Sequence, residues 1–509
     1  AWPGTLGEII PATKDLQVAE LDQAGQPRLL QSMLIVPSVS RTDDALGWAS
    51  AAARDKFFQD QDRWLLRHRF ATTTNLAYGH AFGDYWRRFG QSHPEFFSMA
   101  PNGRREPLPW DATGAAIPLC VSQPALWKQI VEDWAKSPAA PTRPYLNACE
   151  NDSPGMCACP SCRAWDAPDP RFETSPYWSR GVIPDVPRRF TGLGVGLIGY
   201  SMPWSGVVVP DDAPSLSDRY ARFYLALQQK AQKVDPQAIV FGYAYANYWH
   251  APKQTSLNDR IVISYVPPLW FPYTEEMSAS FRENWDGWRA TGAKLVLRPN
   301  LTHAGHNLPI FYARRLAADF AYAAGAGMIG TLFDSLHGAW ANQGPTLYVL
   351  ARMHEHPDWP VERMLDEYYG AFGKAERHVR RYFEHWEAVS NAVSRDDIRR
   401  YNVEEGTRGG GFLDYVMIAD RIFTQPIMVR GRQLMERALK ATAGNPLAEQ
   451  RVSFLEKGLR DAELTLETLA AHRAHKRALS AETEHAYREA IARMVAHRAQ
   501  AESDNVSNM

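Results

Sequence analysis

The feature that most constrains the fold is an alternation between short apolar runs and helical segments, which extends from residue 29 to residue 334. The apolar runs have the composition of buried strands, and there are eight: Leu29–Val36, Thr73–His80, Ala115–Val121, Tyr145–Asn151, Ile239–Ala246, Ile261–Val266, Lys294–Asn300 and Met328–Asp334. The amphipathic segments between them include Ala45–His68, Pro124–Lys136, Ser217–Val234, Glu275–Thr291 and Pro309–Ala324. Strand–helix alternation predicts a parallel sheet with right-handed crossovers. Eight repeats predict an α/β fold of the (β/α)8 TIM-barrel type.

A doubly wound open sheet is the structural alternative to the barrel. Such a sheet normally has a Gly-rich phosphate-binding turn after its first strand. The one Gly-rich run of note, Gly192-Leu193-Gly194-Val195-Gly196, lies in a long loop with no helical pattern after it. We therefore favour the barrel.

After the last expected strand the pattern becomes helical. Helical periodicity covers Val361–Phe372, Ala375–Val393, Phe412–Ala441 and Glu449–His475. We therefore predict a barrel over residues 28–360 and a C-terminal helical domain over residues 361–509.

Charge and hydropathy argue against several classes of function. The 56 basic residues nearly balance the 57 acidic ones, so nothing directs the chain to nucleic acid or to an anionic membrane. No apolar run approaches the ~18 residues of a membrane-spanning helix. The aromatic content, with 17 Trp and 21 Tyr, fits either a sugar-binding cleft or a large aromatic core, because these side chains combine a flat apolar face with a polar edge.

Polar and aromatic side chains gather at or just beyond the ends of several expected strands, where barrel enzymes place their active sites. The candidate substrate-binding residues there are His80, Asn151, Tyr243, Tyr245, Asn247, Trp249, Trp270, Arg298, Asn300, His303 and Asp334. The Pro-, Gly- and Trp-rich segment Ser153–Pro214 follows directly and is expected to wall the cleft. In that segment Trp204 either forms a sugar platform or packs the loop.

Glu150 and Asp152 are the candidate catalytic residues. Side chains at positions i and i+2 of a strand share a face, so both carboxylates are expected to face one cleft. Two neighbouring carboxylates separate each other's pKa values, which lets one hold a proton while the other stays ionised. Glycosidic oxygen needs such an acid to leave. The alternative is a polar turn in which Asp152 caps the bend that follows.

The five cysteines include four within a short stretch: Cys149, Cys157, Cys159 and Cys162. These four have the residue types of a structural zinc or iron–sulfur site, although the spacing is not that of a standard zinc finger. A local disulfide or a packed cluster of thiols is the alternative. Acid-catalysed cleavage of a glycoside by carboxyl groups requires no cofactor.

The stretch from Tyr145 to Asp166, which contains Glu150-Asn151-Asp152 and three of the cysteines in the spacing C-x-C-x-x-C, resembles the hallmark of a bacterial family of glycosidase-like domains. That family was first catalogued as a domain of unknown function and later partly assigned to glycoside hydrolase family 163. Supporting stretches are His93-Pro94-Glu95-Phe96-Phe97, Ser217-Asp218-Arg219-Tyr220, Leu350-Ala351-Arg352-Met353 and Asp366-Glu367-Tyr368-Tyr369-Gly370. The resemblance runs from roughly Trp2 to Glu387.

The resemblance implies a secreted, periplasmic or outer-surface endo-β-N-acetylglucosaminidase that acts on complex N-glycans. It further implies a retaining mechanism in which the acetamido oxygen of the substrate attacks the anomeric carbon. Glu150 is then the favoured general acid and Asp152 the partner of the acetamido group, with the reverse assignment as the alternative. Members of the family usually carry an additional N-terminal α/β domain, so residues 1–27 resemble the junction that follows it.

Two other functions compete with this hypothesis. One is a different glycosidase on the same scaffold, either an exo-hexosaminidase or an α-glucuronidase-like enzyme that would use Arg298 to bind a uronate. The other is a non-catalytic carbohydrate-binding protein. That last hypothesis would gain support if Glu150 and Asp152 both pointed away from the cleft.

Overall fold

The structure, a computed structural model, describes residues 2–7, 27–35, 51–100, 103–107, 113–137, 144–152, 157–168, 215–301, 307–334, 339–406, 415–501, 504 and 506. Its centre is a parallel sheet whose strands lie in the order of the sequence. The strands are β1 (Leu146–Asn147), β2 (Val240–Ala244), β3 (Ile261–Tyr265), β4 (Lys294–Leu297) and β5 (Met328–Thr331). Every residue of β2 and β3 is buried, as expected for strands that are covered on both faces.

The first expected strand lies beside β5 without forming a regular strand. Gln31 and Leu34 make isolated parallel bridges to Gly330 and Phe333. The Leu30 N–H also donates to the Ile329 carbonyl at 2.8 Å. This run therefore continues the sheet beyond β5.

The second and third expected strands are also irregular. Side chains accept from backbone N–H groups that a neighbouring strand would otherwise use. The Gln31 side-chain oxygen accepts from Leu76 N, and the Glu150 carboxylate accepts from Leu119 N. Pro118 has no N–H to donate. Regular pairing is thus lost in Thr73–His80 and Ala115–Val121.

The second run nevertheless connects the first run to β1. At one end Thr73 N donates to the Leu30 carbonyl at 2.9 Å, and at the other Ala81 N donates to the Cys149 carbonyl at 3.0 Å. A path of contacts therefore leads from β5 back to β1, although it bypasses the third expected strand. The closed (β/α)8 barrel stays a prediction, because five of its eight runs form the regular sheet.

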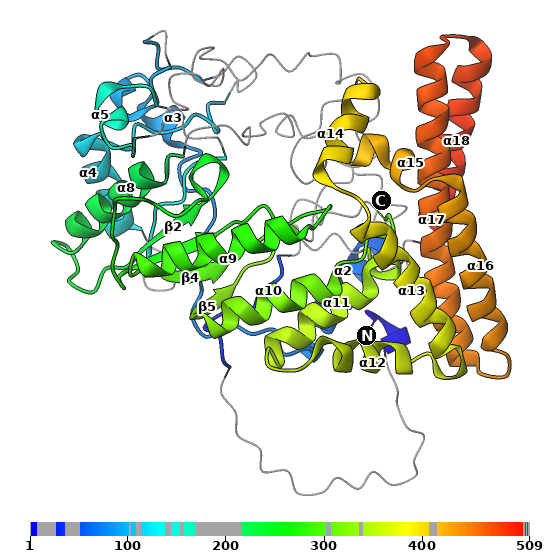
Figure 1. Cartoon of the computed structure of the whole chain (residues 1–509). Helices are drawn as coiled ribbons and strands as arrows, with labels where there is room; N and C mark the ends of the chain where they lie inside the picture. Colours follow the sequence, from blue (N-terminus) through cyan, green and yellow to red (C-terminus); the bar gives the residue numbers. More distant parts are fainter. Residues whose placement is uncertain are drawn as a thin grey trace, which may run out of the picture.

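Helices α4 (Pro124–Lys136), α8 (Ser217–Ala231), α9 (Glu275–Ala290) and α10 (Ala313–Gly325) pack on strands of the sheet (Figure 1). Helix α2 (Ala51–Arg67) precedes the sheet in the sequence, and α11 (Trp340–Glu355) follows β5. Short turns of helix accompany them: η1 (Thr5–Gly7), α3 (Tyr85–Phe89), η3 (Pro94–Phe96), α5 (Pro160–Arg163) and η6 (Ala246–Tyr248). The connection from β2 to β3 contains only η6, so one helix of the ideal repeat is missing there.

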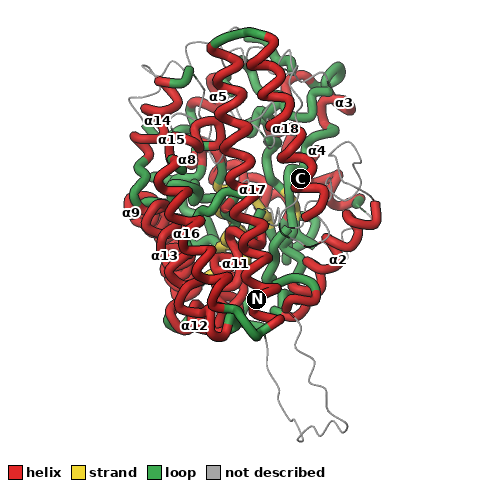
Figure 2. Tube along the Cα trace, turned by 90° about the vertical axis from the view of Figure 1, so that its right-hand side faces the viewer, coloured by secondary structure: helices red, strands yellow, loops and turns green. Residues whose placement is uncertain are grey.

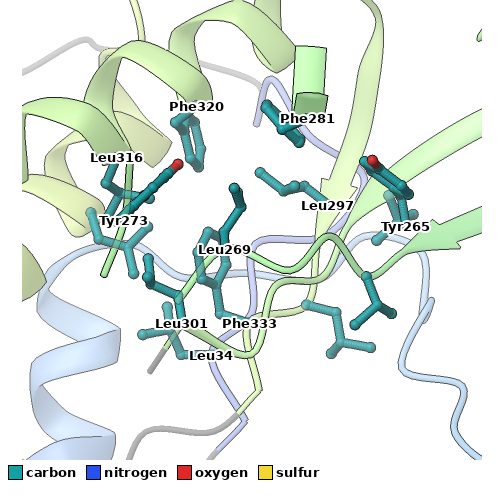
Figure 3. Packing of buried hydrophobic residues seen from close by; sticks show 14 of the residues in the cluster. Leu34, Tyr265, Leu269, Tyr273, Phe281, Leu297, Leu301, Leu316, Phe320 and Phe333 are labelled. Carbon is teal, nitrogen blue, oxygen red and sulfur yellow. The ribbon is translucent and has the colours of Figure 1, made fainter. Parts of the chain in front are cut away.

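The core lies between the sheet and helices α9 and α10. Figure 3 shows Phe281 of α9 and Phe320 of α10 with Leu297 of β4 and Phe333 after β5. Each of these four side chains is at most 2% exposed. Burial of this apolar surface holds the strand ends in place, at about 25 cal/mol per Å² removed from water.

The C-terminal part is helical, as predicted. Its elements are α12 (Val361–Gly370), η8 (Gly373–Ala375), α13 (Glu376–Asn391), α14 (Arg395–Glu404), η10 (Val416–Ile418), α15 (Ala419–Ile422), α16 (Gln425–Ala441), α17 (Pro446–Arg477) and α18 (Ala481–Ala501). Figure 2 shows the long helices α16, α17 and α18 beside one another, and α17 packs on both of its neighbours. The expected single helix Phe412–Ala441 is wrong within the described residues, because η10 and α15 precede α16, which starts anew with Pro426 in its first turn.

The two predicted domains share packed helices. Helix α11 lies before the expected boundary at residue 360 and contacts α10, α12 and α17. From the junction segment predicted over residues 1–27, Trp2 packs on Tyr368 and Phe372 of the helical part. The domain limits stay predictions. Among the described residues no helix is long and apolar enough to cross a membrane.

Candidate active site

The centre of the candidate site is the carboxylate of Asp152, which follows β1. The Tyr245 hydroxyl, just after β2, donates to Asp152 Oδ1 at 2.8 Å. The His80 Nε2 atom lies 4.0 Å from the same oxygen, and its Nδ1 atom donates to the Glu150 carbonyl at 2.6 Å. The Asp152 side chain is 44% exposed, so it can contact a ligand.

A second set of polar side chains, Tyr243, Arg298 and Asp334, lies at the same C-terminal end of the strands, which we call the rim. The Arg298 guanidinium hydrogen-bonds the Tyr243 hydroxyl and forms an ion pair with Asp334 at 2.8 Å. The Tyr243 and Tyr245 rings lie 5.8 Å apart, so this group adjoins the pair of Asp152 and Tyr245. These side chains come from the ends of β2, β4 and β5, as the strand-end argument predicted.

Burial decides the protonation of the tyrosines. Burial, and secondly the Asp152 charge, raises the pKa of Tyr245 well above its ordinary value. Burial likewise raises the pKa of Tyr243. Both phenols therefore keep their protons at neutral pH. The Tyr245 hydroxyl donates to Asp152, and the Tyr243 hydroxyl accepts from Arg298.

Glu150 lies in different surroundings from Asp152. Its carboxylate is completely buried and accepts from Asn151 N at 2.9 Å, Leu119 N at 3.2 Å and the Tyr220 hydroxyl at 3.3 Å. Burial raises the pKa of Glu150 to about 7, although these three hydrogen bonds oppose the shift. The expectation that both carboxylates face one cleft is wrong, because β1 ends at Asn147 and strand alternation does not continue to residue 152.

Asn151 is a structural residue in this arrangement. Its side-chain amide donates to the carbonyls of Ile117 at 2.8 Å and Phe82 at 3.3 Å, and its amide oxygen accepts from Phe82 N. With 1% exposure it is closed to a ligand. The prediction that Asn151 binds substrate is therefore not supported by its surroundings.

The remaining predicted residues are less closely tied to the rim. Asn247 is 4% exposed, and the described residues offer its side-chain amide no hydrogen-bond partner. Trp249 packs against the core next to His250, while the guanidinium of Arg395 in α14 lies over Trp270. Asn300 is half-buried after β4. His303 and Trp204 lie outside the described residues.

A comparison with protein families assigns the chain to one family. The profile of the domain of unknown function DUF4838 matches residues 2–384, about three quarters of the sequence. The chain belongs to the DUF4838 family. No curated protein and no solved structure matches the chain significantly. The matched range agrees with the resemblance seen from roughly Trp2 to Glu387, while the assignment to glycoside hydrolase family 163 stays a prediction.

The DUF4838 segment also holds a cluster of four buried cysteines. The sulfurs of Cys120, Cys157, Cys159 and Cys162 all lie within 4.8 Å of one another. The predicted set with Cys149 is wrong: Cys149 is buried elsewhere, with its sulfur near the Phe241 carbonyl, and Cys120 replaces it. All five thiols are free, so the alternative of a local disulfide does not occur.

Sequence reasoning missed two residues of this part of the DUF4838 domain. Cys120 lies one residue before the end of the third expected strand. It is distant in sequence from the other cysteines, so grouping cysteines by their spacing could not include it. Tyr220 donates to Glu150 from α8. It belongs to the stretch Ser217-Asp218-Arg219-Tyr220 that carried the family resemblance, which is the signal that could have found it.

Proposed function

We propose that this chain is a glycoside hydrolase that cleaves a β-N-acetylglucosaminide linkage in complex N-glycans with retention of configuration. The observation that carries the proposal is the pair of Asp152 and Tyr245, a partly exposed carboxylate joined to a protonated phenol. The pair lies at strand ends of a parallel sheet, on a rim lined with further aromatic and charged side chains. This arrangement suits a sugar, which offers hydroxyl groups and an apolar ring face.

The pair matches the chemistry of an acetamido group. Such a group has an N–H that can donate to the Asp152 carboxylate. Its carbonyl oxygen can accept from the Tyr245 hydroxyl once that hydroxyl turns from Asp152 to the substrate. When that carbonyl oxygen attacks the anomeric carbon, a C–O bond forms in a bicyclic intermediate, the glycosidic C–O bond breaks, and the leaving oxygen takes a proton from solvent. Water then opens the intermediate, restores the acetamido group and returns one proton to solvent. Asp152 stabilises the positive charge of the intermediate, and no enzyme nucleophile is needed.

Glu150 suits a proton donor by its pKa but not by its position. A group with a pKa of about 7 carries a proton for part of the time at neutral pH, which is the property of a general acid. Its carboxyl, however, has no exposed surface and is held by Leu119 and Tyr220. We therefore propose that Asp152 contacts the substrate and that Glu150 is a positioning residue for the segment that carries it.

The surroundings of Arg298 and Asp152 give less support to the competing functions. A uronate-binding enzyme needs an available cation, and Arg298 is already paired with Asp334. A binding protein without activity was expected to turn both carboxylates away from the cleft, whereas Asp152 is accessible and has Tyr245 and His80 beside it.

The test is a glycan-release assay on a complex-type glycoprotein, followed by mass spectrometry. We expect release by the unmodified chain and a loss of about 100-fold or more in Asp152→Asn, since one catalytic carboxylate typically contributes that much. The matched control is Asp259→Asn, an exposed aspartate just before β3, at the opposite end of the sheet. No release by the unmodified chain would contradict the proposed function, and equal activity of Asp152→Asn would contradict the site.

A further inference from the structure

The cysteine cluster joins two segments that are distant in the sequence. Cys120 lies in the third expected strand, one residue before its end, while Cys157, Cys159 and Cys162 follow the triplet Glu150-Asn151-Asp152. The Cys120 sulfur lies 3.6 Å from that of Cys159 and 3.8 Å from that of Cys162. All four side chains are buried, and none forms a disulfide.

These distances are those of a tetrahedron around one ion. Zinc binds thiolate sulfur at about 2.3 Å, which places the sulfurs of a tetrahedral site about 3.8 Å apart. A disulfide would need about 2.05 Å between two sulfurs, and an iron–sulfur cluster would need the four thiols farther apart to surround several atoms. We propose that Cys120, Cys157, Cys159 and Cys162 bind a single structural Zn²⁺ ion.

Hydrogen bonds to the sulfurs complete this arrangement. Met99 N donates to the Cys157 sulfur at 3.3 Å, and Cys162 N donates to the Cys159 sulfur at 3.4 Å. Groups that donate to the ligands orient them and stabilise their charge, as outer partners do in known metal sites. A merely packed group of thiols has no need of such donors.

The charged groups around the four cysteines also fit a zinc site. Four thiolates and one Zn²⁺ carry a net charge of −2, which is costly in a buried site unless cations lie nearby. Arg105 contacts the Cys120 side chain, and the fully buried Arg219 donates to the Cys157 carbonyl at 2.9 Å. Asp166 holds Arg219 through hydrogen bonds of 2.8 and 2.6 Å. Together with Asp166, the two guanidinium groups supply one net positive charge, so they offset part of the charge of the zinc site.

The ion would fix the segment that supports the candidate active site. Leu119, next to Cys120, donates its N–H to Glu150, and the Ile117 carbonyl accepts from the Asn151 side chain. Zinc would thus join this segment to the residues that follow Asp152. The inference rests on the sulfur geometry and stands whether or not the chain is a hydrolase.

Metal analysis of the purified full-length chain tests the proposal directly. We expect about one zinc ion per chain, lost in Cys120→Ser and kept in Cys149→Ser, which changes a buried cysteine outside the cluster and is the matched control. Iron in place of zinc, or loss of zinc in Cys149→Ser alone, would overturn the assignment.

Cobalt substitution keeps the test decisive if Cys120→Ser fails to fold. The unmodified chain, depleted of metal with a chelator and loaded with Co²⁺, should show the intense visible absorption of a tetrahedral tetrathiolate cobalt site. Added Zn²⁺ should abolish that absorption. A spectrum of octahedral cobalt, or the absence of stoichiometric binding, would show that these thiols hold no metal.

Discussion

Glu150 and Asp152 are two positions apart, yet only one of them is open to a ligand. Asp152 is 44% exposed and has Tyr245 as its donor. Glu150 is enclosed by two backbone N–H groups and the Tyr220 hydroxyl. Local backbone geometry after β1 separates the two roles, so the identity of the residues alone could not assign them.

The raised pKa of Glu150 predicts a pH dependence of stability. Because the folded pKa, about 7, exceeds the unfolded value, the folded state binds the proton more tightly. This contribution is fully present below the unfolded pKa of about 4.3 and is lost as the pH rises through the folded value. Glu150→Gln cannot titrate, so the variant should lack this loss of stability, which amounts to about 4 kcal/mol.

Urea unfolding of both chains at pH 5 and pH 8 measures this effect. The free energy of unfolding of the unmodified chain should fall more between the two pH values than that of Glu150→Gln. A hydrogen bond lost in the variant shifts its stability equally at both pH values, so the difference isolates the titration. Parallel behaviour of the two chains would contradict the assignment of a proton to Glu150.

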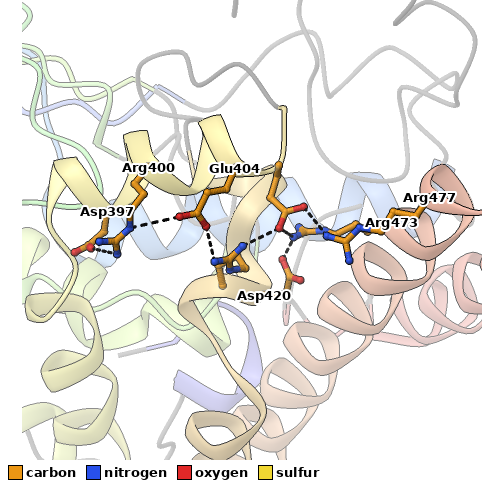
Figure 4. A network of polar contacts seen from close by, with 8 residues as sticks. Asp397, Arg400, Glu404, Asp420, Arg473 and Arg477 are labelled. Carbon is orange, nitrogen blue, oxygen red and sulfur yellow. Dashed lines mark hydrogen bonds and ion pairs between the residues drawn. The ribbon is translucent and has the colours of Figure 1, made fainter.

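At the level of elements, a network of ion pairs joins α14, α15 and α17 (Figure 4). Glu405, which is 8% exposed at the end of α14, pairs with Arg421 of α15 at 2.8 Å and with Arg473 of α17 at 2.7 Å. Arg477 lies 3.2 Å from the same carboxylate. Burial opposes the charge of Glu405, but the three guanidinium groups outweigh it and lower its pKa.

Removal of this carboxylate should loosen the three helices. We expect Glu405→Gln to lower the free energy of unfolding by about 2 kcal/mol at pH 7, because a nearly buried ion pair loses one partner. The lowered pKa of Glu405 means that its stabilisation exists above the unfolded pKa and disappears as the pH falls through the folded value.

Thermal unfolding at pH 7 and pH 3 checks the prediction. The difference in thermal stability between Glu405→Gln and the unmodified chain should be smaller at pH 3 than at pH 7. The control is Glu404→Gln, since Glu404 is more exposed and pairs with Arg421 and Arg400. If Glu405→Gln is less stable than the unmodified chain by the same amount at both pH values, the explanation by ion pairs is contradicted.

Elements with local signals could be predicted from the sequence. The expected helix Pro124–Lys136 matches α4 at both ends, because proline begins it and Gln123 caps it. The expected strand Thr73–His80 fails because its pairing depends on the side chain of Gln31, which is distant in the sequence. Helices α11, α14 and α18 were not predicted, as their packing partners lie elsewhere in the chain.

The candidate site was also predictable in part from the sequence. His80, Tyr243, Tyr245, Arg298 and Asp334 meet at strand ends, as the strand pattern predicted. The ligand set of the cysteine cluster was not predictable from spacing, because Cys120 reaches the others only through the fold. The burial of Glu150 depends on α8, whose position no local pattern gives.

At the scale of the whole molecule, the N-terminal residues pack on the C-terminal helices. Trp2 is 2% exposed, its ring contacts Tyr368 and Phe372, and the Arg451 guanidinium lies 4.5 Å from it. Arg451 also donates to the Leu6 carbonyl. These contacts predict that the N-terminal residues and the helical part stabilise each other.

Trp2→Ala should therefore lower the free energy of unfolding by about 3–5 kcal/mol, the usual cost of removing a buried aromatic ring. Hydrogen exchange followed by mass spectrometry should show faster exchange in α12 and α17 together with the N-terminal residues. The control Trp2→Phe keeps most of the contacts and should stay close to the unmodified chain. Unchanged exchange in α12 and α17 would contradict this coupling.

The central claim is that Asp152 assists the acetamido group of the substrate. Its most direct test is calorimetric titration with a thiazoline analogue of the bicyclic N-acetylglucosamine intermediate. We predict tight binding by the unmodified chain and by the Asp259→Asn control, and binding weaker by about 100-fold in Asp152→Asn, because a charge-assisted hydrogen bond to the intermediate is lost. Equal affinity of Asp152→Asn and the unmodified chain, or no binding by the unmodified chain, would contradict the claim.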